Sequence, residues 1–181
     1  LLKGRCLGLA DTDKGVLMLT EYVLQDAAGE AHAQMRNWSF RVGAKPVGKE
    51  GQVEHVTVTV PKRAPDAVVE EVVSATQAKV YRLSGDYNPL HIHGPFAKRG
   101  GFSQPILHGL CSLAIATRQV LEQFCGGDGH QLRAVHVRFS SPVLPGDCLA
   151  TAMWKEGSRV VFTTTNKASG KVVLRNAYVD L

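Results

Sequence analysis

A carboxylate, an amide and an imidazole occur within six residues of one another, in the segment from Asp86 to His91. Asn88 precedes a proline, which disfavours the helical region for the residue before it, so a tight turn is predicted here. A second segment, 105–111, places Gly109 at the start of an apolar stretch that is predicted to be helical. Carboxylates and imidazoles act as general acids and bases, and a helix N-terminus offers unpaired N–H groups to an anion. The two segments together predict an acid–base site beside an anion site.

Each of these residues also has a plainer interpretation. Asp86 and Asn88 are residue types that bond their own backbone in turns. A lone His91 is more often a packed or surface histidine, and His108 is more often a first-turn helix residue that bonds the backbone. Gly109 by itself is explained by packing. The functional interpretation therefore depends on Asp86, Asn88, His91 and Gly109 occurring together, and His108 is given a lesser role.

A metal site is a further alternative. The pairs His91 and His93, and His108 and Cys111, offer imidazoles and a thiol at spacings that suit a metal. Against this reading, Cys111 lies three positions beyond His108 on a helix that is predicted to pack in the core. We expect no metal.

The residues before the turn are predicted to be mainly strands. A hairpin turn is predicted at 26–29, and the glycines and proline of 43–51 predict a loop. Alternation of apolar and polar residues in 53–60 predicts a further strand. The remaining predicted strands of this part are 5–10, 16–25, 31–42 and 68–73.

The turn and Gly109 lie in a part of the chain that is predicted to contain the helices. Ser74 is predicted to cap a helix that ends at Ser84 and Gly85, a short helix begins near Pro95, and a long one spans 108–124. That long helix is apolar nearly all round, including Leu110 and Ala114, so it is predicted to be enclosed. Four strands follow, at 132–140, 148–154, 159–166 and 171–179. Their short connections predict an antiparallel sheet that wraps the long helix, an α+β architecture.

Composition excludes several classes of protein. The 181 residues, 44% hydrophobic and 20% charged, suit one domain or one domain plus part of another. No stretch approaches the roughly 18 to 20 apolar residues that span a bilayer, and the first residues do not predict a signal peptide. The net charge of +5 is dispersed and accompanies no recognisable module, so no nucleic-acid partner is predicted. Four cysteines without paired short spacings predict reduced thiols in an intracellular compartment.

The pattern Tyr-Arg-Leu-Ser-Gly-Asp-x-Asn-Pro-Leu-His at 81–91, followed by Pro-Ile-Leu-His-Gly-Leu-Cys at 105–111, resembles the signature of the MaoC-like, R-specific enoyl-CoA hydratase 2 family. The resemblance extends through 141–147, 153–157 and 176–180, and it is strongest to the hydratase portion of peroxisomal multifunctional enzyme type 2. It implies the hotdog fold. This chain departs from the pattern at His93-Gly94-Pro95. Relatives carry an aspartate directly before the proline, and that aspartate would cap the next helix.

The chemistry of such a site is hydration of a double bond conjugated to a thioester. It needs a base for the water, a proton for the α-carbon and stabilisation of the enolate oxygen. Asp86 and His91 are predicted to hold one water between them, with Asn88 orienting that water or His91. The backbone N–H of Gly109 is predicted to bind the thioester carbonyl oxygen, and His108 has a secondary role in substrate binding. The resemblance implies that one water supplies both the hydroxyl and the proton, giving a (3R)-3-hydroxyacyl-CoA.

The resemblance also implies an organisation and partners. Residues 61–181 would form the catalytic hotdog repeat, and residues 1–43 the later strands of an incomplete, non-catalytic repeat, with a loop and connecting strand at 44–60. The expected partners are an acyl-CoA thioester, whose CoA belongs to the substrate so that no cofactor is needed, and a second copy in a homodimer. The chain is expected to be part of a larger multifunctional polypeptide and, in a eukaryote, peroxisomal. Two other functions remain open: an acyl-CoA-binding or scaffolding hotdog with weak or no catalysis, and a hotdog thioesterase.

Overall fold

The chain forms two compact units, Leu1–Val56 and Thr57–Leu181. The computed structural model describes residues 1–51, 53 and 56–181. Within these residues, no helix is long and apolar enough to cross a membrane. All four cysteines are free thiols, as predicted.

The first unit is a four-stranded antiparallel sheet in the order β3-β2-β1-β4. The three predicted strands of this part are confirmed, and the hairpin turn closes where Asp26 N donates to Glu30 O at 3.0 Å. Glu21 is buried in the sheet and accepts hydrogen bonds from Arg5, Gln34 and Arg36. The bond from Arg5 holds the pKa of Glu21 below its usual range. The strands are β1 (Leu2–Thr12), β2 (Gly15–Gln25), β3 (Ala31–Val42) and β4 (Glu50–Gly51).

The strand predicted over 53–60 is not found in the residues that can be described. Residues 52, 54 and 55 lie outside the described part, and residues 53 and 56–60 belong to no strand. Val58 N donates instead to the Asn176 side chain at 2.6 Å. Alternation of apolar and polar residues makes a strand only where a neighbouring strand pairs with it, and residues 57–60 are assigned to no strand.

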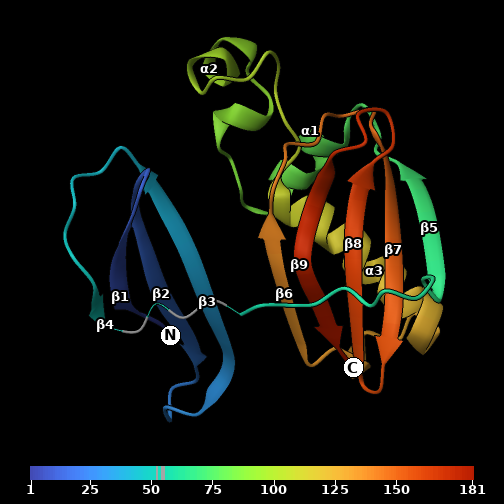
Figure 1. The fold of residues 1–181 in the computed structure, drawn as a ribbon, viewed down its shortest axis with the longest axis horizontal. Coiled ribbons are helices and arrows are strands. Elements are labelled where there is room, and N and C mark those ends of the chain that lie inside the picture. Colours follow the sequence, from blue (N-terminus) through green and yellow to red (C-terminus); the bar gives the residue numbers. More distant parts are fainter. Residues whose placement is uncertain (52, 54–55) are drawn as a thin grey trace. The chain divides into compact units, whose positions relative to one another are not determined.

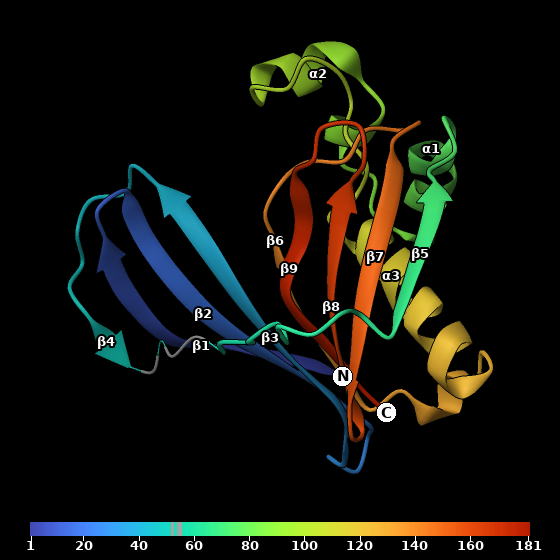
Figure 2. The same cartoon turned by 45° about the vertical axis from the view of Figure 1, so that its right-hand side comes forward.

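The second unit is a five-stranded antiparallel sheet with α3 (Gly109–Cys125) along one face (Figures 1 and 2). The strand order is β5-β7-β8-β9-β6. Val120 and Ala116 of the helix pack in one core with Met153 and Phe162 of the sheet, and all four are fully buried. The predicted sheet around a long helix is therefore confirmed. Its strands are β5 (Ala67–Val72), β6 (Ala134–Phe139), β7 (Cys148–Glu156), β8 (Arg159–Asn166) and β9 (Val172–Asp180).

Enclosure of α3 on all sides was predicted, and this prediction is wrong at two positions. Leu110 is 59% exposed and Ala114 is also exposed. Only one sheet packs on the helix within this unit, so the helix face that points away from the strands keeps its apolar side chains at the surface.

Four short helices lie before α3, around the site segments, and a fifth follows it. The helix predicted from Ser74 is shorter than expected, because Thr76 occupies the N-cap of α1, and the Ser74 hydroxyl accepts from Thr76 N at 3.2 Å instead. Gly85 follows the end of this helical stretch and has a φ of 119°, a conformation that favours glycine. The elements are α1 (Gln77–Tyr81), the 3₁₀ helices η1 (Arg82–Ser84), η2 (Pro89–His91) and η3 (Gly129–Gln131), and α2 (Gly94–Arg99).

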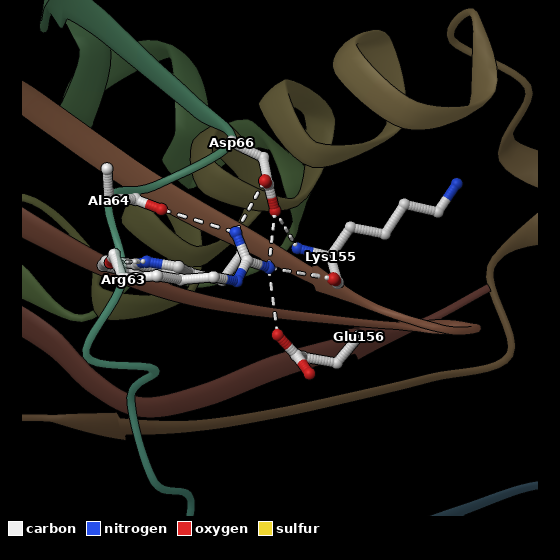
Figure 3. A network of polar contacts seen from close by, with 6 residues as sticks. Arg63, Ala64, Asp66, Lys155 and Glu156 are labelled. Carbon is white, nitrogen blue, oxygen red and sulfur yellow. Dashed lines mark hydrogen bonds and ion pairs between the residues drawn. The ribbon is translucent and has the colours of Figure 1, made fainter.

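An arginine clamp holds the segment that enters β5 against β7 (Figure 3). The Arg63 guanidinium donates to both carboxylate oxygens of Asp66, at 2.6 and 2.9 Å, and to Glu156 at 2.9 Å. Asp66 also accepts from Lys155 N at 2.7 Å. The bonds from Arg63 and then from Lys155 lower the pKa of Asp66. The network fixes one end of the sheet that supports α3.

Candidate active site

The turn between η1 and η2 is held by its own side chains. Asp86 Oδ1 accepts from Asn88 N at 3.2 Å, and Asn88 Oδ1 accepts from Leu90 N at 3.0 Å. Pro89 opens η2 directly after Asn88, whose ψ of 121° is extended, as its position before a proline requires. The plainer interpretation of Asp86 and Asn88 as turn formers is therefore realised. The turn also directs His91, at the end of η2, into the protein.

His91 is buried, with one ring nitrogen bound to the backbone. The residue is only 8% exposed, and Nδ1 lies 2.8 Å from Ile106 O. A carbonyl oxygen only accepts, so Nδ1 carries the proton and Nε2 of the neutral ring keeps its lone pair. His91 is thus prepared to accept a proton at Nε2.

Asp86, His91 and His108 converge in space. One ligand-type atom from each lies within 4.8 Å of those from the other two, with Asp86 exposed and both histidines buried. The structure therefore brings together the two residues predicted to hold a water, and it adds His108 to them. Asn88 was predicted to orient the water or His91, but its side-chain oxygen accepts a hydrogen bond from Leu90 N within the turn.

His108 makes more contacts in the site than its predicted secondary role suggested. It is 1% exposed, its Nε2 lies 3.2 Å from Asp86 O, and its ring stacks on His91 with centroids 3.7 Å apart. Burial lowers the pKa of His108 below its ordinary value. The sequence signal was its position directly before Gly109, but nothing in the spacing showed that the ring would meet His91.

Gly109 begins α3 and places its N–H at the helix N-terminus. His108 O accepts from Cys111 N and Ser112 N, so the N–H groups of Gly109 and Leu110 have no partner within the helix. A Cβ placed on Gly109 would lie 3.1 Å from two ring carbons of Phe139. The glycine therefore permits both close packing of Phe139 and close approach of a ligand to the helix terminus.

Two pockets border these residues. One has a volume of about 270 Å³, and its largely apolar lining includes Phe102, Ile106, Gly109, Phe139 and Val143. The other, also about 270 Å³, includes His91, Lys79 and Gln104. The proposed oxyanion donor and the imidazole base thus each line a cavity large enough for part of a ligand.

The ligand sets that the spacing suggested for a metal are not assembled. Within the described residues, the group of potential ligands contains Asp86, His91 and His108, and neither His93 nor Cys111 joins it. Both histidines of this group use one ring nitrogen on a backbone carbonyl. The arrangement is better suited to moving a proton between a carboxylate and an imidazole.

Comparison with known proteins supports this reading of the fold. Residues 56–177 match the family model described as "MaoC like domain". The chain is 49% identical over 144 residues to peroxisomal multifunctional enzyme type 2 of Mus musculus, covering 78% of this chain and 20% of that protein. It is 39% identical over 184 residues to the peroxisomal enoyl-CoA hydratase 2 of Arabidopsis thaliana, covering 96% and 59%.

A solved structure shows the same fold. The MaoC-like dehydratase from Phytophthora capsici superposes with a TM-score of 0.92 at 42% identity, covering 99% of this chain and 63% of that one. The α+β hotdog class is thereby confirmed. The chain spans about a fifth to about three fifths of the length of these proteins. It belongs to the family of MaoC-like domains.

Proposed function

We propose that the chain is an R-specific enoyl-CoA hydratase, which adds water to a trans-2-enoyl-CoA and forms a (3R)-3-hydroxyacyl-CoA in fatty acid β-oxidation. The observation that carries the proposal is the convergence of Asp86 and the two buried histidines, one of which directly precedes Gly109 at the N-terminus of α3. The name of the Arabidopsis relative, enoyl-CoA hydratase 2, supports the same reaction.

The water is held between Asp86 and His91. His91 accepts at Nε2, because Nδ1 donates to Ile106 O, and the Asp86 carboxylate accepts a second hydrogen bond from the same water. As the water oxygen bonds to C3 of the substrate, one of its protons passes to this pair, and the pair returns a proton to C2. The C2–C3 double bond becomes single and the acid–base groups regain their initial state, so the sum is addition of one water.

Negative charge develops on the thioester oxygen during the attack, and Gly109 N–H lies at the positive end of α3 to receive it. Loss of one such donor costs about 3 to 4 kcal/mol in the transition state of enzymes that have been dissected. The apolar pocket beside Gly109 then accommodates part of the substrate. Asn88 supports the reaction by holding the turn that carries Asp86 and η2.

The organisation predicted from the sequence belongs to the same proposal. Residues 1–43 are the later strands of a preceding hotdog repeat, a reading supported by the three long antiparallel strands β1, β2 and β3. The chain acts within a larger multifunctional polypeptide and is peroxisomal, as the mouse relative's name suggests. Two copies form a homodimer, since β5 and β6 are edge strands and sheet edges are suited to pairing.

The test is to mix the protein with a short trans-2-enoyl-CoA and to follow loss of the enoyl-thioester absorbance, with chiral analysis of the product. A (3R)-3-hydroxyacyl-CoA is expected. Release of free CoA thiol would identify a thioesterase, and an (S) product would overturn the stereochemical assignment. Absence of turnover would leave an acyl-CoA-binding domain as the better description.

A further inference from the structure

The side chain of His108 is enclosed by groups of the candidate site. It is 1% exposed, and its Nε2 lies 3.2 Å from the backbone oxygen of Asp86. Since a carbonyl oxygen only accepts, Nε2 carries the proton. Nδ1 is buried and has no hydrogen-bond partner among the described residues. A second proton on the ring would therefore be buried without an acceptor, which is costly. The geometry favours a neutral ring in the Nε2–H form.

The ring of His108 also fixes the orientation of His91. The two rings stack with centroids 3.7 Å apart and planes inclined at 25°. Tyr81 from α1 packs on His108 with centroids 4.8 Å apart and an inclination of 51°. His91 is held at the same time by the bond from Nδ1 to Ile106 O. Rotation of the His91 ring would break that bond and the stack together.

His108 thus contacts both of the proposed acid–base residues. Its hydrogen bond reaches the backbone of Asp86, and its ring face meets His91. The residue itself stands directly before Gly109 at the N-cap of α3. One side chain therefore relates the positions of the carboxylate, the imidazole base and the helix terminus.

We propose that His108 is a positioning residue that remains neutral, holding the Asp86 backbone and the His91 ring in the arrangement that binds the attacking water. The role rests on the proposed hydratase function, but the neutral Nε2–H form does not. A neutral His108 ring suits the proposed reaction, because a charged ring stacked on His91 would oppose protonation of His91. The charged or titratable groups that face His108 are His91 from η2, Asp86 from the turn, Arg82 from η1 and Tyr81 from α1.

Two substitutions separate the two contacts. His108→Gln places an amide nitrogen near the position of Nε2 and keeps a donor for Asp86 O, but it removes the stack on His91. His108→Phe keeps a flat ring against His91 and removes the donor. Each is expected to lower kcat by about ten- to a hundredfold through misplacement of the acid–base pair, with KM within about threefold of the wild type. The pH profile of kcat is expected to move in both.

The control is His130→Gln, which changes an exposed histidine of η3 and is expected to leave kcat, KM and the pH profile unchanged. Circular dichroism and thermal unfolding establish that each variant is folded. Wild-type kcat for both His108 variants, or losses confined to KM, would overturn the positioning role.

Nitrogen NMR of ring-labelled histidine tests the proposal on the wild type without activity. His108 is expected to show the neutral Nε2–H pattern throughout the range of about pH 5 to 8 in which an ordinary histidine titrates. A charged ring, or the Nδ1–H form, would overturn the proposal even if hydration is observed. If hydration is absent, the proposed function fails, and the positioning role for hydration fails with it. The NMR result still decides whether His108 is neutral.

Discussion

Nδ1 of His91 lies 2.8 Å from the carbonyl oxygen of Ile106, three residues before Gly109. This bond selects the ring form that leaves Nε2 free to accept a proton. It also ties the proposed base to the segment that enters α3, because Leu107 N, next along that segment, donates to Val143 O at 2.7 Å. The base and the proposed oxyanion donor are therefore positioned by one short stretch of backbone.

Removal of either acid–base group should abolish most turnover. Asp86→Asn keeps the shape of the side chain and its turn bond but removes the carboxylate, and His91→Gln keeps a polar nitrogen but removes the base. Each is expected to lower kcat for enoyl-CoA hydration by about 10²- to 10⁴-fold. Steady-state kinetics measure the effect, with His130→Gln as the control. Activity near that of the wild type in either variant would refute the pair.

Gly109→Ala should impair catalysis more than stability. The added Cβ would meet the Phe139 ring at 3.1 Å, but Phe139 is 47% exposed and has room to move. We expect kcat/KM to fall by about tenfold or more, because the methyl group obstructs the approach of the thioester to the helix terminus.

The double variant Gly109→Ala with Phe139→Leu identifies the cause of that loss. If crowding of Phe139 were responsible, the smaller leucine would restore activity. We expect no restoration, since Phe139 is 47% exposed and can move away from the added Cβ by itself.

Asp66→Asn should change the acid sensitivity of the fold. Arg63 and Lys155 N lower the folded-state pKa of Asp66 below 3.8, so its contribution to stability is complete above about pH 3.8 and is lost as the pH falls through the lower folded value. The variant is expected to unfold at a lower temperature than the wild type at pH 7. The gap should narrow as the pH falls below 3.8.

Thermal unfolding between neutral and acid pH measures this difference. Asp13→Asn, in an exposed hairpin turn of the first unit, is the matched control. A gap between Asp66→Asn and the wild type that stayed constant with pH would mean that the Arg63 clamp does not act through the charge of Asp66.

Phe162→Ala should be the most damaging truncation in the second unit. Phe162 is 0% exposed and lies in the core that joins β8 to α3, so its loss leaves a cavity and is expected to cost about 3 to 5 kcal/mol. Denaturant unfolding checks the value against Phe96→Ala, whose ring is 43% exposed. Equal effects of the two variants would contradict the assignment of the core.

Much of the secondary structure was predictable because its causes are local. Asn88-Pro89 imposes a turn, and Gly85 supplies a positive φ that other residues avoid. The strands after α3 are separated by short connections. The strand predicted at 57–60 failed for the opposite reason, since a strand forms only by pairing with a neighbouring strand, which local alternation does not specify. Exposure of Leu110 likewise depends on how many layers cover the helix.

For the candidate site, the residue types, and the turn and helix start that carry them, could be predicted from local sequence. Two contacts could not be predicted in this way. His108, seventeen positions after His91, stacks on the His91 ring, and Ile106 O selects the nitrogen of His91 that carries the proton. Spacing along the chain constrains the backbone over a few residues. The meeting of side chains from different segments depends on packing across the whole unit, which no local pattern specifies.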